Sequence, residues 1–171
     1  WNAPASPTPS QLLSGGFQVN STRSEPGVVT WQTTASALVP AANLGGAAYK
    51  GAYIQFDSLG RPQDEDLIIP NLDFSAVTSA ARLTFKSLGV GGFGFTRFSV
   101  DVSNNGGLTW NTVAQRVRGV DPETGQNFGG PAFFTLNLRP AVLDITRWAA
   151  GYSTVSIRFR YEGLDDADWT V

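Results

Sequence analysis

The sequence contains no cysteine, no histidine and no methionine among its 171 residues. Without cysteine the chain has no disulfide, no thiolate nucleophile and no zinc–thiolate site. Without histidine it lacks the most common general base of enzymes and the most common ligand of transition metals. Without methionine, Trp1 is expected to be the end of a processed or excised piece of a longer product. Few of the usual catalytic chemistries are therefore open to this chain.

Charge and long apolar runs are also scarce. Charged residues make up 15% of the chain, and the formal net charge is −2. Nucleic-acid binding requires a positive surface that offsets the phosphate charge, so no nucleic-acid partner is predicted. No apolar run approaches the about 20 residues that span a bilayer, so no membrane span is predicted. The apolar share of 42% is typical of a globular protein of one domain.

What the sequence does contain is a series of short alternating segments separated by turn residues. In the clearest, residues 97–103, Phe98, Val100 and Val102 alternate with polar side chains, as in a half-buried strand. Residues 81–88, 134–138 and 154–161 repeat the pattern, and weaker candidates are 16–20, 28–32, 48–56, 67–70 and 110–117. About nine to ten strands at this spacing predict an all-β, antiparallel, two-sheet jelly-roll β-sandwich.

Three segments depart from this pattern. Residues 1–11 carry three prolines, which lack the N–H of a ladder, so this segment is predicted to be a linker or arm outside the domain at 12–171. Residues 143–149 predict at most one short helical turn, packed by Ile145 and Trp148. The glycine-rich run that starts at Gly89 predicts a loop before the strongest strand.

The sharpest local signature is Ser-Asn-Asn-Gly-Gly-Leu-Thr-Trp at residues 103–110. The Asn-Gly pair supplies the positive φ angles of a tight hairpin between two strands. The segment resembles the Asp-box hairpin, with Asn105 at the usual aspartate position. Because Asp-boxes are structural turns in most proteins that carry them, a role in folding is predicted rather than a direct ligand contact.

Two groups of residues are candidates for binding. Acidic runs at 64–66 and 165–168 resemble the carboxylate clusters that calcium prefers, and could equally be solvated turns. The candidate ligands of a structural calcium are Asp66, Asp165, Asp166 and Asp168. Exposed aromatic rings stack on sugars, and the candidate ligand contacts are Tyr49, Tyr53, Phe93 and Phe95, of which the last two are predicted to be most exposed.

Catalysis is not predicted, and no catalytic residue is assigned. Glycoside hydrolysis needs two carboxyl groups at a fixed separation across a cleft, and no sequence pattern supports such a pair. Serine chemistry would need a lysine base, and neither Lys50 nor Lys86 belongs to a Ser-x-x-Lys pattern. The chain is expected to be no enzyme itself, although it could be an accessory domain of a secreted hydrolase.

Several modest motifs occur in a fixed order along residues 14–171. They are Gly16-Phe17, Trp31, 66–74, 81–85, the Val-Asp-Val-Ser…Gly-Gly-Leu-Thr-Trp stretch of 100–110, Leu-Asp-Ile at 143–145, 155–161 and Asp-Trp-Thr-Val at 168–171. Together they resemble the MAM-like jelly-roll modules of bacterial secreted proteins, called cleaved-adhesin or choice-of-anchor J domains. The resemblance implies a galactose-binding-like sandwich, often stabilised by calcium, that serves as a non-catalytic module. Gln18 stands where the family usually has glutamate.

The leading prediction is a non-catalytic binding module of a secreted or cell-surface protein, with carbohydrate as the expected ligand class. The alternative is a structural or adhesive subunit of an extracellular fibre or surface layer, assembled by self-association through residues 1–11. A proline-rich arm could reach the sheet edge of a neighbour by strand addition.

Overall fold

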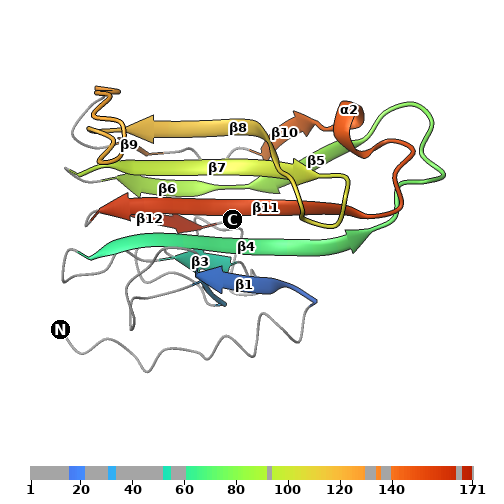
Figure 1. Cartoon of the computed structure of the whole chain (residues 1–171), viewed down its shortest axis with the longest axis horizontal. Coiled ribbons are helices and arrows are strands. Elements are labelled where there is room, and N and C mark those ends of the chain that lie inside the picture. Colours follow the sequence, from blue (N-terminus) through green and yellow to red (C-terminus); the bar gives the residue numbers. More distant parts are fainter. Residues whose placement is uncertain are drawn as a thin grey trace.

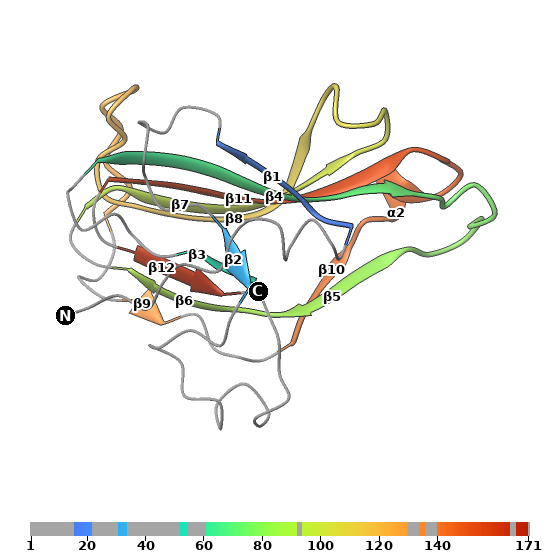
Figure 2. The ribbon, with the colours of Figure 1, turned by 90° about the horizontal axis from the view of Figure 1, so that it is seen from below.

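The computed structural model describes residues 16–21, 31–33, 52–54, 61–91, 94–129, 134–135, 140–164 and 167–170. These residues form two sheets that stack face to face, with a smaller two-stranded sheet at one end (Figures 1 and 2). Every strand pairing is antiparallel. The predicted all-β jelly-roll sandwich is confirmed.

The front sheet has five strands in the order β1-β4-β11-β7-β8. Their bounds are β1 (Gln18–Ser21), β4 (Pro62–Leu72), β11 (Val155–Leu164), β7 (Thr96–Ser103) and β8 (Asn111–Arg118). The alternation seen in the sequence places the apolar residues of β7 and β11 toward the second sheet and their polar residues outward.

The back sheet has the order β2-β3-β12-β6-β9. Its strands are short: β2 (Gln32–Thr33), β3 (Ala52–Ile54), β12 (Ala167–Thr170), β6 (Leu88–Gly91) and β9 (Phe134–Thr135). Beyond it, β5 (Arg82–Lys86) pairs with β10 (Pro140–Asp144), which leads into the single turn α2 (Thr146–Ala149). The described residues thus hold twelve strand segments, more than the nine to ten predicted, because pairings as short as two residues count.

An aromatic cluster fills the space between the two sheets. Trp169 of β12 lies 5.0 Å from Phe98 and 5.4 Å from Trp31, measured between ring centroids. Phe159 and Tyr161 of β11 belong to the same core and are at most 4% exposed. Aromatic rings bury large apolar areas, so this cluster holds the sheets together from their inner faces. The outer face of the front sheet is thereby left to polar side chains.

Candidate functional site

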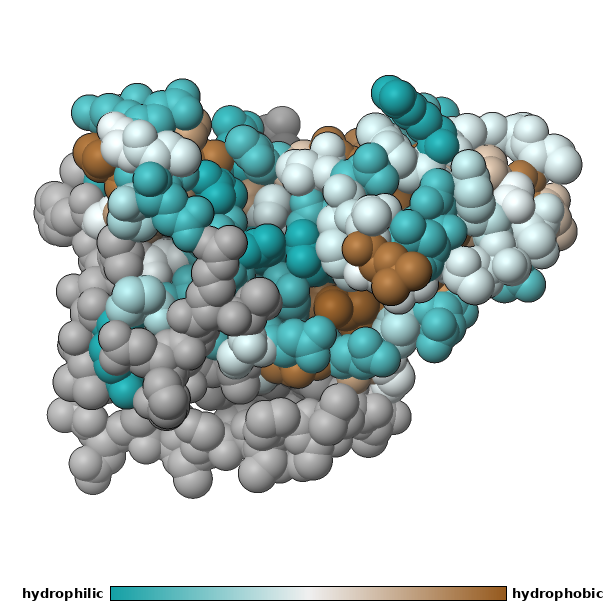
Figure 3. Space-filling model, viewed as in Figure 1, coloured by the Kyte–Doolittle hydropathy of each residue, from teal (hydrophilic) through white to brown (hydrophobic). Residues whose placement is uncertain are grey.

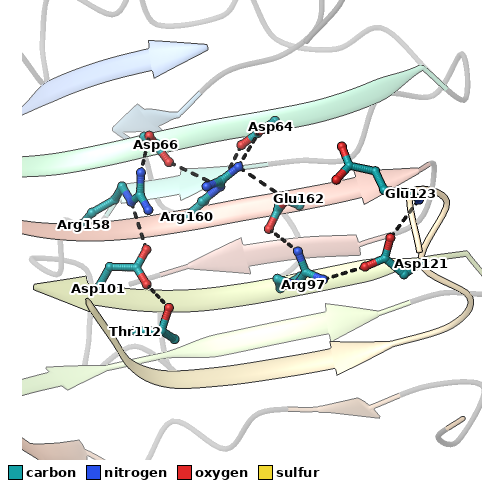
Figure 4. Close-up of polar contacts among 10 residues, drawn as sticks. All are labelled: Asp64, Asp66, Arg97, Asp101, Thr112, Asp121, Glu123, Arg158, Arg160 and Glu162. Carbon is teal, nitrogen blue, oxygen red and sulfur yellow. Dashed lines mark hydrogen bonds and ion pairs between the residues drawn. The ribbon is translucent and has the colours of Figure 1, made fainter. Parts of the chain in front are cut away.

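A charge ladder crosses the outer face of the front sheet. We use this name for Asp101, Arg158, Asp66, Arg160 and Asp64, which strand register places side by side on that face. The Arg158 Nε donates to Asp101 Oδ2 at 2.9 Å, and its Nη1 donates to Asp66 Oδ2 at 3.2 Å. The Arg160 guanidinium binds both oxygens of Asp64, at 2.9 and 2.7 Å (Figure 4). Charges of alternating sign therefore join three adjacent strands.

The charged network continues toward the start of β7. The Arg97 guanidinium binds Glu162 at 3.0 Å and Asp121 at 2.8 Å, and it lies 5.2 Å above the ring of Phe95. Backbone N–H donation from Glu123 is the main reason that the pKa of Asp121 lies below its usual value. This end of the face has a hollow of about 90 Å³ that Phe95 lines.

Asp66 is a buried carboxyl group at the centre of the ladder. Its residue is 4% exposed, and burial raises its pKa from 3.8 to about 6 despite the nearby Arg158 and Arg160 guanidinium groups. Its Oδ1 accepts no hydrogen bond from the part of the chain that the structure describes, and Arg160 Nε lies 3.9 Å away. Desolvation disfavours the charged form of a carboxyl group, so Asp66 is ionised at neutral pH at an energetic cost.

A larger hollow of about 230 Å³ lies between β1 and the hairpin that joins β7 to β8, and we call it the hairpin hollow. Figure 2 shows this hairpin rising above the outer side of the sheet, where it forms a wall. Figure 3 shows the same face covered mainly by hydrophilic residues, with a hydrophobic patch toward the hairpin end. The side chains that line the hollow include Gln18, Asn20, Asp66, Ile68, Trp110 and Ser156.

The hairpin wall satisfies its own polar groups. The Ser103 Oγ accepts hydrogen bonds from the backbone N–H of Gly107 at 2.9 Å and of Asn105 at 3.3 Å. The Asn105 side chain holds Thr109 through two bonds, of 2.9 and 3.0 Å. Gly106 and Gly107 have φ values of 69° and 91°, which favour glycine. These contacts support the predicted folding role of residues 103–110.

Trp110 connects the wall to the charge ladder. The Arg158 guanidinium lies 4.5 Å from the centre of the Trp110 ring, a cation–π contact. On the wall side, a Cβ atom at Gly107 would lie 3.4 Å from the ring, so the hairpin backbone at Gly107 lies close to the ring. The Trp110 ring is partly exposed and lines the hairpin hollow.

A bulge in β4 shapes the end of the hairpin hollow. The β4–β11 register shifts where Val155 faces Leu72 and Ile157 faces Ile69, so β4 has one extra residue there. Within this bulge Asn71 has a φ of 58°, the single positive φ among described residues other than glycine. Bulges bend a strand and re-aim side chains, and they are over-represented beside functional sites. Asn71 lines the hollow.

Replacing Ser103 with alanine is expected to destabilise the protein by about 1–3 kcal/mol, because the N–H groups of Asn105 and Gly107 lose their acceptor. In a thermal melt, each kcal/mol of lost stability lowers the midpoint temperature by about 2–4 °C. The exposed Ser79, which lies in a turn, provides the matched control, and Ser79→Ala should leave the midpoint nearly unchanged. Equal effects of the two changes would contradict a structural role for Ser103.

Of the four predicted ligand contacts, the structure describes Phe95 and the backbone of Tyr53, which belong to different parts of the fold. Phe95 is 7% exposed, so the prediction that its ring is exposed is wrong: the ring is covered by Arg97 and lines the smaller hollow. Tyr53 lies in β3 opposite Gln32. Tyr49 and Phe93 lie outside the described residues, as do residues 1–11.

The predicted calcium ligands are likewise not brought together within the described residues. Asp66 belongs to the charge ladder of the front sheet, whereas Asp168 lies in β12 of the back sheet, opposite Val90. Asp165 and Asp166 lie outside the described residues. In the part of the chain that the structure describes, no group of three acidic side chains has a geometry that could hold a metal ion. Calcium binding stays a prediction.

The sequence does not predict Trp110, Gln18 or Asn20 as ligand contacts: Trp110 is noted there as the end of the hairpin signature, and Gln18 as a departure from the family. Alternation in 154–161 does place Arg158 and Arg160 on one polar face, and Asp64 and Asp66 share that face by strand register, whereas Glu65 pairs with Tyr161 on the inner face. The sequence does not show that β4 and β11 pair, and without that pairing the contact between these acids and arginines cannot be predicted. None of the described helices has the length and hydropathy of a membrane-spanning segment.

Comparison with known proteins gives similarity at the level of fold. No family model matches the chain, and no curated protein matches it. The K1 cleaved adhesin domain of Lys-gingipain from Porphyromonas gingivalis is 15% identical, over 90% of this chain and 89% of that one, with a TM-score of 0.47. The module TmCBM61, solved with β-1,4-galactotriose, is 10% identical over 98% and 94%, with a TM-score of 0.46.

A third similar structure is the enzymatically active domain of tailspike protein 4 from bacteriophage CBA120, at 12% identity, 91% of this chain, 18% of that chain and a TM-score of 0.44. Similarity this low does not assign a function. Cleaved adhesin domains, to which the sequence predicts a resemblance, are among these similar structures, whereas the MAM-like and choice-of-anchor J relationship stays a prediction.

Proposed function

We propose that this chain is a non-catalytic carbohydrate-binding module of a secreted or cell-surface protein, and that it takes a sugar in the hairpin hollow. The observation that carries the proposal is the composition of that hollow. It combines amide, hydroxyl and carboxylate groups with one partly exposed tryptophan ring on a self-supporting wall.

The polar groups of the hollow match the chemistry of a saccharide. Each sugar hydroxyl both donates and accepts hydrogen bonds, and the side-chain amides of Gln18, Asn20 and Asn71 can meet either need. The Asp66 carboxylate also lines the hollow and adds a charged acceptor group to it. A hydroxyl that donates to an ionised carboxylate forms a charge-assisted hydrogen bond, about twice as strong as a neutral one.

Trp110 supplies the apolar part of the site. An aromatic side chain offers a large rigid surface at low entropic cost, and its quadrupole favours the weakly positive C–H groups of a sugar. The Arg158 contact and the hairpin fix the Trp110 ring before any ligand arrives. At about 230 Å³ the hollow is smaller than the about 300–1,000 Å³ of drug-sized sites, so it suits one sugar ring rather than a long chain.

Binding without turnover is the simpler interpretation of the same geometry. A glycosidase requires two carboxyl groups that face each other across the scissile bond. Among the described residues that line the hairpin hollow, Asp66 is the one carboxyl group. Asp64 and Asp101 are engaged by arginines within the ladder.

The test is retention of the protein by a panel of insoluble and gel-embedded polysaccharides, followed by titration with the oligosaccharide that retains it. Asn20→Ala, an exposed position that should not affect folding, and Trp110→Ala are both expected to weaken binding at least tenfold. Tyr152→Ala removes an exposed aromatic ring elsewhere, 43% exposed, and should bind as the unchanged protein does.

Retention that survives both hollow variants would overturn the proposed site. Release of soluble sugar during long incubation would instead indicate a glycosidase. Repeating the titration in EDTA and then in excess calcium tests the calcium prediction separately, because a structural ion would change the melting temperature whether or not sugar is present.

A further inference from the structure

A buried arginine lies on the inner side of the front sheet. Arg118, the last residue of β8, is 8% exposed, and the register pairs it with Thr96 of β7. Since Thr96 also pairs with Gly163 of β11, two residues beyond the core residue Tyr161, this row of positions faces the space between the sheets. The Arg118 Nη1 is sealed from solvent and makes no hydrogen bond with the described residues.

This arrangement differs from that of the other arginines of the sheet. Arg97, Arg158 and Arg160 each bind at least two carboxylates, at distances down to 2.7 Å. They do so on the outer face, where water is close at hand. Arg118 has no such carboxylate among the described residues, although it is the most buried of the four. An unpaired buried charge is strongly unfavourable, and natural proteins compensate it with a counter-charge.

Two residues in or beside the row of Arg118 carry hydroxyl groups that can donate hydrogen bonds. The Thr96 side chain is 0% exposed, and its hydroxyl makes no hydrogen bond with the described residues. The Tyr161 hydroxyl occupies the space that a side chain at Gly163 would take, one strand further along the same row. A guanidinium can only donate, and the two hydroxyls can each donate. Three adjacent strands thus place buried residues that carry donor groups in one row on the inner face of the sheet.

We propose that Arg118 and Thr96 form an enclosed site for a small monovalent anion, with chloride as the fitting species. Chloride accepts several hydrogen bonds at once, and it supplies the negative charge that the guanidinium lacks. Because Arg118 Nη1 and Thr96 Oγ1 are both closed to solvent, a bulky anion does not fit. Water could satisfy the hydroxyl but would leave the charge uncompensated.

The anion would stabilise the end of the sandwich beside the smaller hollow. Gly119 follows Arg118 and has a φ of 77°, and a Cβ atom there would lie 2.6 Å from the carbonyl oxygen of Gly94. The chain therefore packs tightly where β8 ends. Fixing Arg118 fixes the start of the segment that carries Asp121, the partner of Arg97.

The experiment compares unfolding in sodium chloride with unfolding in sodium gluconate at equal ionic strength. Above the dissociation constant, each tenfold rise in chloride is expected to lower the unfolding equilibrium constant about tenfold, and gluconate should have no such effect. Arg118→Met should abolish the chloride response. Arg116→Met removes the same charge from an exposed position of the same strand, so it should retain the response.

Thr96→Val, nearly equal in volume, provides a second variant in case Arg118→Met fails to fold, and it should weaken the chloride response. An equal response to chloride and gluconate in the unchanged protein would overturn the proposal. So would a chloride response that both Arg118→Met and Thr96→Val retain. These outcomes are independent of sugar binding, which is measured on the opposite face of the sheet.

Discussion

Replacing Arg158 with methionine is expected to lower the free energy of unfolding by about 3–5 kcal/mol, the typical effect of removing one partner from a buried ion pair. The Arg158 side chain is 12% exposed and lies between two carboxylates that are still more buried, those of Asp66 and Asp101. Without the guanidinium, both acids keep their burial and lose a counter-charge. The Trp110 ring also loses its cation–π contact.

Urea unfolding at pH 7.5 measures this effect, and Arg116→Met at an exposed position of β8 is the matched control. Exposed charges contribute little to stability, so the control should change the free energy by at most about 1 kcal/mol. Adding Asp101→Leu to Arg158→Met should recover part of the loss, because one of the two uncompensated acids is then gone. A loss for Arg158→Met no greater than that of the control would show that the ladder is structurally unimportant.

The sequence predicted the elements whose side chains alternate, and it missed those that depend on pairing. Strand β7 (Thr96–Ser103) lies where the alternation of residues 97–103 predicts it, with one further residue at its start. Strand β6 occupies part of a glycine-rich run that was predicted to be a loop, and it forms because β12 and β9 hydrogen-bond to its backbone on both sides. Backbone pairing does not require side chains, so composition alone could not reveal it.

In the candidate site too, the local features could be predicted from the sequence and the features that depend on strand pairing could not. Residues 103–110 predicted a structural hairpin because its turn chemistry is local, and the structure agrees. The hairpin hollow is built from β1, β4, β11 and the hairpin, which are far apart in sequence, and its shape depends on a one-residue register shift. The exposure of Phe95 was mispredicted for a related reason: its cover, Arg97, is held by Glu162 and Asp121 from other elements.

Replacing Asp66 with asparagine is expected to change how stability depends on pH. The pKa of Asp66 is about 6 in the folded protein against 3.8 as its ordinary value, so the folded state holds the proton more tightly. The stabilising effect of that proton is complete below pH 3.8 and is lost as the pH rises to about 6. A shift of about two units corresponds to about 3 kcal/mol.

The quantity to measure is the difference in unfolding free energy between the unchanged protein and Asp66→Asn, from pH 3.5 to 7.5. Relative to Asp66→Asn, the unchanged protein should lose about 3 kcal/mol of stability as the pH rises to about 6, and the difference should then stay constant. Asp73→Asn is the control of opposite sign, because hydrogen bonds from Ser75 lower the pKa of Asp73. The ionised Asp73 carboxylate stabilises the fold when the pH is above the ordinary pKa of the group, and this stabilisation is lost as the pH falls. A flat difference for Asp66→Asn would contradict the buried, under-satisfied carboxylate.

The same measurement distinguishes a structural role of Asp66 from a role in binding. A sugar hydroxyl that donates to the Asp66 carboxylate would favour the ionised form and lower the pKa of the group. At pH 7.5, saturating oligosaccharide should therefore raise the unfolding free energy of the unchanged protein more than that of Asp66→Asn. Above pH 6 the carboxylate would then strengthen binding, and affinity should fall as the pH drops below 6. If saturating sugar stabilises both proteins equally at pH 7.5, the ligand does not contact Asp66.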